Sequence, residues 1–419
     1  MSTFAAVMTG KGTGAISTIQ LFGERPRAII KKIFKPAGSK PAILKPGKIY
    51  LGTINNGSEI IDQVTIGCEG PHSFAINCHG NPLIVSEIMK LLAQHGATLI
   101  AAEQLLTKIL TAGKFTNTIA LEAKLAQPTA RTIEGAKIIA NQINAGLSKT
   151  AQRWLQNINA VSLNKIKKGA ERILQTSQTA KLIIHGCTMV LAGPPNTGKS
   201  TLLNALAGRQ KAIVTDIKGT TRDWVSARCK ISPLAAEVID TAGMDEPCPS
   251  EGLGEKLTIT PKNTIGKKSQ QKTAEILQEA DLVLLVLDNS KTADQLEDKL
   301  LEKIAGRLVL SKACLEHSRR AEGKTLTVLN KSDLPAKFDT VKLPQMLANT
   351  IRISAEFGAG IENLIEKIRQ ITGVADFDLQ QPVCFTSRQE NLVKQLCKTK
   401  SKDQAASIIT ELLNGQLRV

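Results

Sequence analysis

The chain has 419 residues, enough for two or three domains with buried cores. Hydrophobic residues make up 42% and charged residues 22%, an ordinary balance for a soluble protein. No apolar run reaches membrane-spanning length and the N-terminus has no secretory pattern, so we expect a cytoplasmic protein without membrane contact. The eight cysteines are scattered, as is typical of reduced thiols. Packing explains Cys78-His79 better than a metal site does, because no second ligand pair has the right spacing.

The formal net charge of +17 predicts attraction to polyanions, with RNA or the ribosome as candidates. A solvated lysine surface explains the same charge equally well. Lysines cluster in 165–168 and in 262–272, on expected helix and loop surfaces. The aromatic share of 3% argues against binding nucleic acid by base stacking.

Residues 1–118 form the first expected domain. Short alternating runs at Ala15–Leu21, Lys48–Thr53 and Ile60–Ile66 predict strands, and Leu83–Gln94 has helical periodicity. The combination predicts an α+β domain. Residues 119–183 then repeat Ala, Leu, Ile and Lys with Pro128 as the one strong breaker, which predicts the first segment of a helical domain.

A phosphate-loop pattern opens the next region. Gly193-Pro194-Pro195-Asn196-Thr197-Gly198-Lys199-Ser200 follows a predicted strand, Thr188–Ala192, and precedes a helical pattern, Thr201–Leu206. In that context, backbone N–H groups and the helix N-terminus cradle phosphates, and glycines allow the close approach. We expect Lys199 to reach the β- and γ-phosphates and the Ser200 hydroxyl to bind Mg²⁺.

Two switch-like segments follow. Thr220-Thr221, in Gly219–Asp223, lies where a threonine completes the Mg²⁺ shell, which assigns Thr221 to the metal. Asp240-Thr241-Ala242-Gly243 follows a predicted strand, Ala236–Ile239, and would place a carboxylate near the metal and an N–H near the γ-phosphate. Such loops are held by the γ-phosphate and released by hydrolysis, so we expect phosphoryl transfer to water.

The base-reading pattern selects guanine. Asn330-Lys331-Ser332-Asp333 follows an apolar strand, Leu326–Leu329. The Asp333 carboxylate can accept both guanine donors, Asn330 would tie the loops together, and the Lys331 stem would cover the base. Ile351–Ala355 predicts a short strand whose final loop, Ser354-Ala355, contacts the guanine oxygen. The order and spacing predict GTP and GDP as ligands and disfavour an ATPase.

These motifs place an α/β P-loop GTPase domain at 184–374. Residues 375–419 follow, and Gln389–Leu417 again has a helical pattern. Isolated helices need a packing partner, so we expect the GTPase domain to be inserted in one helical domain formed by 119–183 and 375–419. The predicted GTP-binding set is Asn196, Thr197, Gly198, Lys199, Ser200, Thr201, Thr215, Thr220, Thr221, Asp240, Thr241, Ala242, Gly243, Asn330, Lys331, Asp333, Ser354 and Ala355.

With these motifs in place, the chain resembles the bacterial tRNA-modification GTPases called MnmE or TrmE over nearly its whole length. The pointers are Asn196, the run Thr215–Asp223 and, more weakly, Pro71-His72-Ser73, Cys78-His79-Gly80 and Leu121–Gln127. The resemblance implies an N-terminal folate-binding domain that forms a homodimer. It also implies a flavoprotein partner of the MnmG/GidA type and modification of the wobble uridine of tRNA.

The resemblance further implies that K⁺ replaces an arginine finger. Asn196 would supply a side-chain oxygen to K⁺, and Thr215, Ile217 and Thr220 would supply others. A fixed cation beside the β- and γ-phosphates neutralises charge that develops in the transition state. Simple hydrogen bonding within the loop is the alternative for Asn196. Two facing GTPase domains would order the switch loop, so GTP would control domain closure.

The chain departs from the family pattern at three places. The sequence stops at Leu417-Arg418-Val419 without the family's Phe-Cys-Ile-Gly-Lys tail, and Cys397 is better explained by helix packing than as a substitute. Lys124 matches a folate-ligand position, but the family's arginine and glutamate appear as Gln20 and Ala75, which argues against a tetrahydrofolate cofactor.

The third departure is the long stretch Met244–Glu279, in which the family's catalytic glutamate has two candidates, Glu251 and Glu255, with surface charge as the alternative for each. The sequence therefore predicts a potassium-assisted GTPase of tRNA modification. The alternative is a divergent G-protein switch or scaffold that binds GTP and RNA or a ribosomal partner without modification chemistry.

Overall fold

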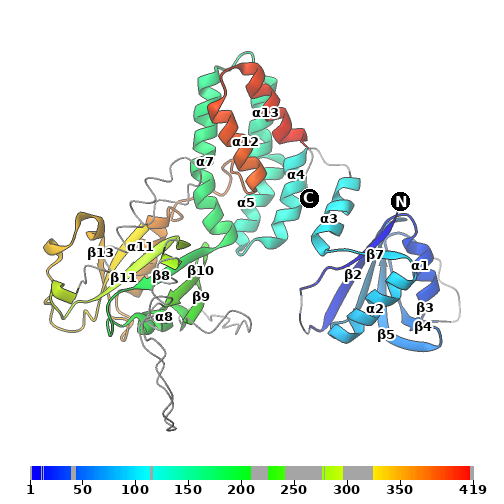
Figure 1. The fold of residues 1–419 in the computed structure, drawn as a ribbon, viewed down its shortest axis with the longest axis horizontal. Coiled ribbons are helices and arrows are strands. Elements are labelled where there is room, and N and C mark those ends of the chain that lie inside the picture. The colour runs from blue at the N-terminus through cyan, green and yellow to red at the C-terminus, as the bar shows by residue number, and fades with distance from the viewer. Residues whose placement is uncertain are drawn as a thin grey trace, which may run out of the picture. The chain divides into compact units, whose positions relative to one another are not determined.

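The computed structural model describes residues 2–10, 12, 14–38, 44–113, 117–208, 225–240, 276–277, 279–295 and 324–415. The chain divides into two compact units, one that runs to Leu125 and one that spans Ala126–Gly415 (Figure 1). Each unit is described below by itself.

The first unit is built on a seven-stranded sheet in the order β3-β4-β5-β6-β2-β1-β7. Its strands are β1 (Thr3–Val7), β2 (Ile16–Phe22), β3 (Phe34–Pro36), β4 (Lys48–Asn56), β5 (Glu59–Cys68), β6 (Ser73–His79) and β7 (Ala97–Leu99). Its helices are α1 (Pro26–Ile33), α2 (Pro82–Gln94), α3 (Ala102–Ala112) and α4 (Thr118–Ala126). All neighbouring strands are antiparallel except β1 and β7, which are parallel.

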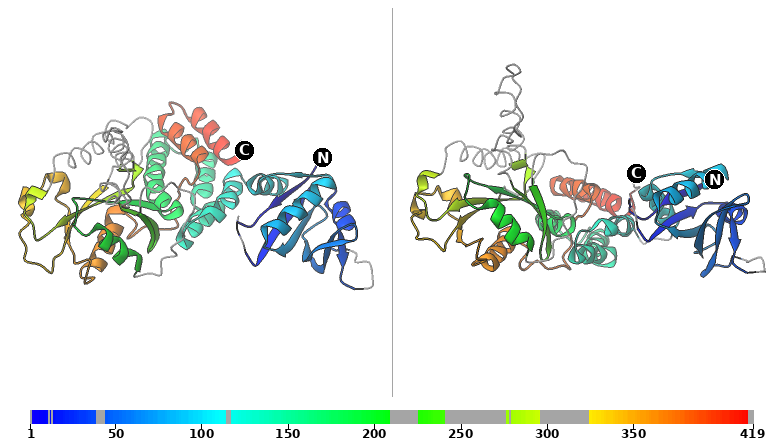
Figure 2. Two further views of the ribbon diagram at one scale, coloured as in Figure 1. Left: turned by 60° about the horizontal axis from the view of Figure 1, so that its bottom comes forward. Right: turned by 90° about the horizontal axis from the view of Figure 1, so that it is seen from below.

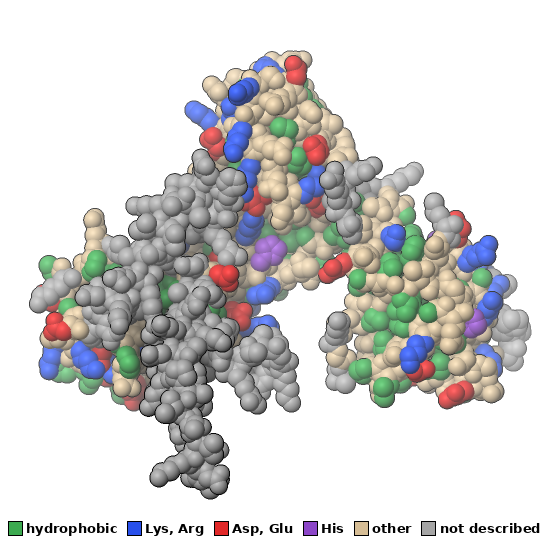
Figure 3. Space-filling view, viewed as in Figure 1, with side chains coloured by type: hydrophobic (Ala, Val, Ile, Leu, Met, Phe, Trp, Pro, Cys, Tyr) green, Lys and Arg blue, Asp and Glu red, His purple; other side chains and the backbone are tan. Residues whose placement is uncertain are grey.

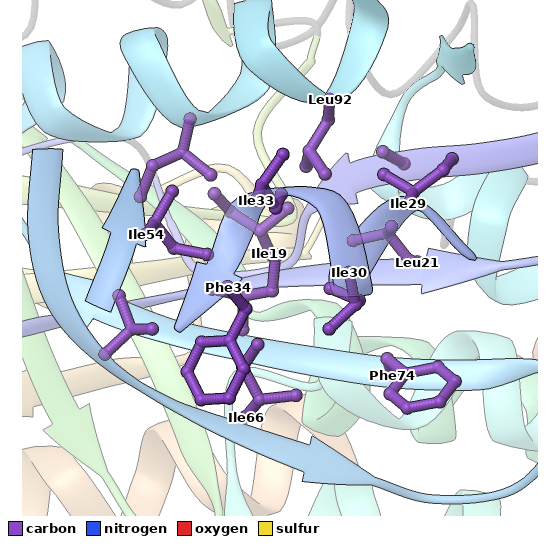
Figure 4. Packing of buried hydrophobic residues seen from close by; sticks show 14 of the residues in the cluster. Ile19, Leu21, Ile29, Ile30, Ile33, Phe34, Ile54, Ile66, Phe74 and Leu92 are labelled. Atoms are coloured by element: carbon purple, nitrogen blue, oxygen red, sulfur yellow. The ribbon is translucent and has the colours of Figure 1, made fainter. Parts of the chain in front are cut away.

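The core of this unit lies between one face of the sheet and the helices α1 and α2. Ile19 and Ile66 on the strands face Ile30 on α1 and Leu92 on α2, and all four are fully buried (Figure 4). Alternation along β6 explains the one-sided burial: Phe74, Ile76 and Cys78 point into the core while their neighbours are partly or fully exposed. The predicted strands and the helix Leu83–Gln94 of this region are confirmed.

The second unit contains a six-stranded sheet in the order β13-β12-β11-β8-β10-β9. The five strands from β13 to β10 are parallel, and β9 pairs with β10 in the antiparallel direction. The strands are β8 (Cys187–Ala192), β9 (Val225–Ile231), β10 (Leu234–Asp240), β11 (Leu282–Asp288), β12 (Lys324–Asn330) and β13 (Thr350–Arg352). All seven residues of β11 are buried, as expected for a central parallel strand covered on both faces.

The helices of this unit lie before, among and after these strands in the sequence, and several of them pack into a bundle. They are α5 (Ile133–Asn144), α6 (Gly146–Gln156), α7 (Leu163–His185), α8 (Lys199–Gly208), α11 (Ile361–Thr372), α12 (Ser387–Lys398) and α13 (Lys402–Asn414). Short 3-10 helices are η1 (Gln127–Thr129), η3 (Ala293–Gln295), η4 (Thr340–Lys342) and η5 (Gln345–Leu347). Helices α12 and α13, which follow the sheet in the sequence, pack against α6 and α7, which precede it (Figure 2).

Gln142 joins the two segments of the bundle. Its side chain is fully buried, its oxygen accepts from Leu147 N at 2.7 Å and Val383 N at 3.1 Å, and its nitrogen donates to Gln381 O at 3.1 Å. A second link is the ion pair between Lys181 on α7 and Glu390 on α12. Burial raises the pKa of Glu390, but hydrogen bonds from Lys181 and Lys394 outweigh it and hold that pKa below its ordinary value.

The structure refines two sequence predictions. The helical pattern Gln389–Leu417 is interrupted: α12 ends at Lys398, and α13 begins after Ser401, whose hydroxyl accepts from Gln404 N. A serine at this position caps the orphan N–H groups of a new helix, so the chain turns there without Gly or Pro. The predicted strand Ile351–Ala355 is shorter, because β13 ends at Arg352. No helix in the described part of the chain has the length and apolarity to cross a membrane.

Candidate nucleotide-binding site

Four loops meet at the carboxyl edge of the second sheet. The Gly193–Gly198 loop follows β8, Asp240 ends β10, Asp288 ends β11 and Asn330 ends β12. Because these strands are parallel neighbours, their carboxyl ends share one edge, which is where open α/β sheets bind ligands.

The loop after β8 has room for glycine alone at two positions. A Cβ on Gly193, at φ +148°, would lie 2.1 Å from the Val286 carbonyl oxygen, and one on Gly198, at φ +88°, would lie 2.3 Å from Asn330 Nδ2. Both contacts are far shorter than any real Cβ contact. The loop therefore packs closely against β11 and β12. It leads directly into the N-terminus of α8, and a glycine-containing loop before a helix N-terminus is an arrangement that binds phosphates.

Lysine and serine at the start of α8 lie where the phosphate-loop pattern predicts them. Lys199 is buried, and its ammonium donates to the carbonyl oxygens of Gly193 and Pro194, each at 2.8 Å. Ser200 Oγ donates to Asp240 Oδ2 at 2.6 Å. A hydroxyl and a carboxylate side by side are hard oxygen ligands of the kind Mg²⁺ takes, so these two residues fit that ion.

Asn330 ties three loops together. Its Nδ2 donates to the Thr197 carbonyl oxygen at 2.9 Å, and its Oδ1 accepts from Ala355 N at 2.9 Å. Ser354 N, in turn, donates to Ala359 O at 2.9 Å, which closes the turn after β13. One buried amide therefore fixes the distance between the phosphate loop and the Ser354-Ala355 loop.

Lys331 lies over the same edge and is held at both ends. Its backbone has a positive φ of 61°, and its ammonium donates to the Asn196 carbonyl oxygen and to Asp288 Oδ2, each at 2.8 Å. The ammonium thus bridges the loop after β8 and the end of β11. Asp333, two residues on, is exposed and has no hydrogen-bond partner among the residues described, so its carboxylate is available to a ligand.

Asp288 is a site residue that the sequence motifs did not reveal. It is 1% exposed and accepts from Ser290 N at 2.9 Å and Ser290 Oγ at 2.6 Å as well as from Lys331. Burial raises its pKa, but the hydrogen bonds from Lys331 and Ser290 prevail and hold it below the ordinary value. The available signal was a polar residue directly after a wholly apolar strand, Leu282–Leu287.

The structure therefore brings together the predicted site residues that it describes: Asn196, Thr197, Gly198, Lys199, Ser200, Thr201, Asp240, Asn330, Lys331, Asp333, Ser354 and Ala355. Asn196 is exposed at φ 61°, at the rim of the loop. Nine predicted residues lie outside the described ranges: Thr215, Ile217, Thr220, Thr221, Thr241, Ala242, Gly243, Glu251 and Glu255.

The candidate folate position lies in the first unit. Lys124 is exposed on α4. Gln20 is nearly buried, and its Nε2 donates to Glu69 Oε2 at 2.8 Å and Ser73 Oγ at 2.9 Å. Ala75 is the register partner of Gln20 on β6. An amide committed to internal acceptors beside a carboxylate is a poor match for a negatively charged cofactor, so these residues do not fit folate.

Cys78 and His79 do not form a metal site with their neighbours. Burial and the charge of Asp62 raise the pKa of the Cys78 thiol to about 11. His79 Nδ1 lies 2.7 Å from Asp62 Oδ1, and Asp62 also accepts from His79 N. In the described part of the chain, no three His, Cys, Asp or Glu side chains come together as a metal site would require. No disulfide joins the described cysteines, of which Cys397 is half-buried.

Comparison with known proteins gives two family matches. Residues 188–331 match the family described as "50S ribosome-binding GTPase", and residues 3–121 match "GTP-binding protein TrmE N-terminus". The first match spans the phosphate loop and the carboxyl ends of β10, β11 and β12, but not the Ser354-Ala355 loop.

Three curated relatives carry the name "tRNA modification GTPase MnmE". The protein from Lactococcus lactis subsp. cremoris is 30% identical over 430 residues, covering 94% of this chain and 87% of that protein. The protein from Endomicrobium trichonymphae is 29% identical, covering 99% and 93%, and the one from Clostridioides difficile is 27% identical, covering 88% and 81%. On this similarity along almost the whole length, the chain belongs to the MnmE family of tRNA modification GTPases.

Proposed function

We propose that this protein binds GTP, hydrolyses it to GDP, and acts in the modification of tRNA at the wobble uridine. The observation that carries the proposal is the pair of hydrogen bonds from Asn330, which join the phosphate loop to the loop after β13 at one sheet edge. The site thereby pairs a phosphate cradle with a base-reading loop at a fixed separation. The name shared by the relatives supplies the tRNA substrate.

Guanine would lie between Lys331 and the Ser354-Ala355 loop. The Asp333 carboxylate would accept the two guanine donors, and the stem of Lys331, whose ammonium bridges Asn196 and Asp288, would cover one face of the base. The backbone N–H of the Ser354-Ala355 turn would face the guanine oxygen. Adenine has neither the two adjacent donors for Asp333 nor the oxygen for this backbone N–H, so the arrangement favours GTP and GDP over ATP.

The phosphates would lie on the N–H groups of 196–201. Lys199 would exchange its two loop carbonyls for the β- and γ-phosphates, which costs little because its ammonium already lies over the loop. Ser200 and Thr221 would bind Mg²⁺, which neutralises charge on the phosphates, and Asp240, Thr241, Ala242 and Gly243 would complete that side of the site. A bound water attacks the γ-phosphate in this class of reaction, oriented here by Glu251 or Glu255.

We also propose that K⁺ assists hydrolysis. The Asn196 side chain is exposed, while its carbonyl oxygen is engaged by Lys331, so the amide oxygen can face a cation at the phosphates. Thr215, Ile217 and Thr220 would provide the other oxygens. A cation held there stabilises the negative charge of the transition state in place of an arginine.

We base the proposed order of domains along the chain on its membership of the MnmE family. We propose that the GTPase domain, 184–374, interrupts a helical domain made of 119–183 and 375–419, and that residues 1–118 form the dimerisation domain of a homodimer. The hydrogen bonds of Gln142 across the two helical segments support this arrangement. A flavoprotein of the MnmG/GidA type is the proposed partner, in the cytoplasm.

Three measurements test the proposal. Asp333→Asn should shift preference from guanine to xanthine nucleotides, and unchanged guanine selectivity would refute the base-reading assignment. GTP turnover should be faster in K⁺ than in Na⁺ buffer, and equal rates would remove the potassium proposal. Wobble-uridine analysis of tRNA from a deletion strain should show unmodified nucleosides. Unaltered nucleosides with intact GTP turnover would favour a G-protein switch or scaffold instead.

A further inference from the structure

One end of the helical bundle carries a cluster of six lysines, which we call the basic end: Lys165, Lys167 and Lys168 on α7, Lys398 and Lys400 where α12 ends, and Lys402 at the start of α13. The two groups meet in space, because Lys402 Nζ donates to the Asn159 carbonyl oxygen at 2.7 Å, just before α7. Figure 3 shows Lys and Arg side chains, with some Asp and Glu side chains among them, over the upper part of the bundle, where α7 begins and α12 ends.

These lysines do not pair with the carboxylates nearest to them in sequence, Glu171 on α7 and Asp403 on α13, in the described part of the chain. Within the described ranges, none of the six forms an ion pair with a carboxylate, whereas Lys181 and Lys394 farther along the same helices both pair with Glu390. Four of the six are exposed: Lys165, Lys168, Lys398 and Lys400.

The position of three of them opposes helix stability. Lys165, Lys167 and Lys168 lie in the first two turns of α7, which has no acidic residue in its first turn. A cation near a helix N-terminus faces the positive end of the helix dipole, which is unfavourable and is felt most by Lys165, in the first turn. Helix stability therefore does not explain this pattern, whereas an external anion would.

We propose that the basic end is a surface that binds the phosphate backbone of RNA, and of the tRNA substrate in particular. The inference rests on the proposed role in tRNA modification and adds the surface that meets the nucleic acid. Lysine is a point charge that binds phosphate without a demand for planar geometry. Lys165 and Lys168 are one helical turn apart, about 4.5 Å along the axis, a separation of the same order as that of successive phosphates.

The contact predicted here is electrostatic and does not read sequence. The six side chains offer no aromatic ring for base stacking and no flat fork for a base edge, so they would position the RNA rather than select it. Affinity should then fall steeply as salt rises, because binding releases counterions from the RNA.

The test uses the full-length chain and a matched control. The variant K165Q/K168Q/K398Q/K400Q removes four exposed charges from the basic end. The control K31Q/K32Q/K45Q/K48Q removes four exposed charges from the first unit. Binding of fluorescently labelled tRNA is measured by anisotropy in K⁺ buffers from about 50 to about 300 mM salt, and GDP affinity is measured on the same preparations.

We expect the basic-end variant to bind tRNA about ten- to a hundred-fold more weakly at low salt, with the slope of log K against log salt reduced by about 3. The control should bind nearly as the unchanged protein does, and GDP affinity should be the same in all three. Equal losses in both variants, no loss in either, or no tRNA binding by the unchanged chain would each overturn the proposal. Failure of GDP binding in the unchanged chain would instead refute the proposed GTPase function.

An acidic protein is the competing occupant of this surface. If the basic-end variant keeps its tRNA affinity but loses binding to polyglutamate, the surface takes acidic polypeptide and the RNA proposal is wrong.

Discussion

Asp288 offers a sharp test of how the guanine side of the site is built. Three donors converge on its carboxylate: Lys331 Nζ at 2.8 Å, Ser290 N at 2.9 Å and Ser290 Oγ at 2.6 Å. Asp288→Asn keeps the shape but leaves one acceptor oxygen for these donors and turns an amide N–H toward at least one of them. The variant therefore loses a charge-assisted hydrogen bond and gains a donor–donor contact.

The magnitude follows from burial. Breaking a fully buried ion pair by removing one charge costs about 3–5 kcal/mol. The Lys331 side chain is 33% exposed, however, so water replaces part of the interaction. We therefore expect that loss of the Lys331–Asp288 ion pair costs about 1–2 kcal/mol. If Lys331 covers the base, loosening it should raise the Kd of GTP and of GDP alike, by about five- to thirty-fold.

The assay is isothermal titration of GDP and of a non-hydrolysable GTP analogue in Mg²⁺. Asp294→Asn is the control, since Asp294 is exposed on the following turn and accepts from Thr292 Oγ1 rather than from Lys331. Unchanged Kd values in Asp288→Asn would refute the positioning role. A loss confined to the GTP analogue would place the effect of Asp288 at the γ-phosphate instead of at the base.

Three further outcomes are expected. Gly193→Ala should lower the free energy of unfolding by about 2–4 kcal/mol in urea titrations, because the new Cβ would collide with backbone. Gly57→Ala is the control: Gly57 has φ +62° and open space around it, so the free energy of unfolding should fall by only about 1 kcal/mol. Gln142→Leu should cost about 3 kcal/mol by leaving Leu147 N and Val383 N unpaired, with GDP affinity unchanged in calorimetry. Glu390→Gln should destabilise the protein at pH 7. The difference should shrink as pH falls below the ordinary glutamate pKa and be lost once pH passes the lowered folded pKa; a difference that stays constant in acid unfolding curves would contradict this sign.

Local patterns predicted the phosphate loop and the strands β2, β4, β5, β8, β10, β12 and β13, but not β1, β3, β6, β7, β9 or β11. The β8 strand, the loop glycines and α8 are adjacent in sequence, so hydrophobic runs and Gly spacing specify them without tertiary information. Asn330 could be assigned a tying role because its motif is contiguous, and the structure shows the two hydrogen bonds that perform it.

Asp288 and Gln142 could not be predicted in the same way. Asp288 belongs to no contiguous motif, and its importance comes from β11 lying between β8 and β12, a strand order that the sequence does not state. Gln142 reads as a surface position of a helix, yet it is fully buried because residues 381–383 return to it from more than 200 residues away. Both are polar side chains whose partners are distant in the chain.

The join between α7 and β8 connects the nucleotide site to the helices that carry the basic end. Gly186 alone separates the last residue of α7 from the first of β8, and a Cβ there would lie 2.7 Å from the Ala235 carbonyl oxygen, on the strand next to β8. Thr132 Oγ1 also donates to Ile183 O at 2.7 Å, and Arg131 N donates to Ile184 O, which fixes the end of α7 to the start of α5. With one residue between them and both sides hydrogen-bonded, α7 has little freedom to move independently of β8. The helix whose first turns bear Lys165 and Lys168 is therefore continuous, through one residue, with the strand that leads into the phosphate loop.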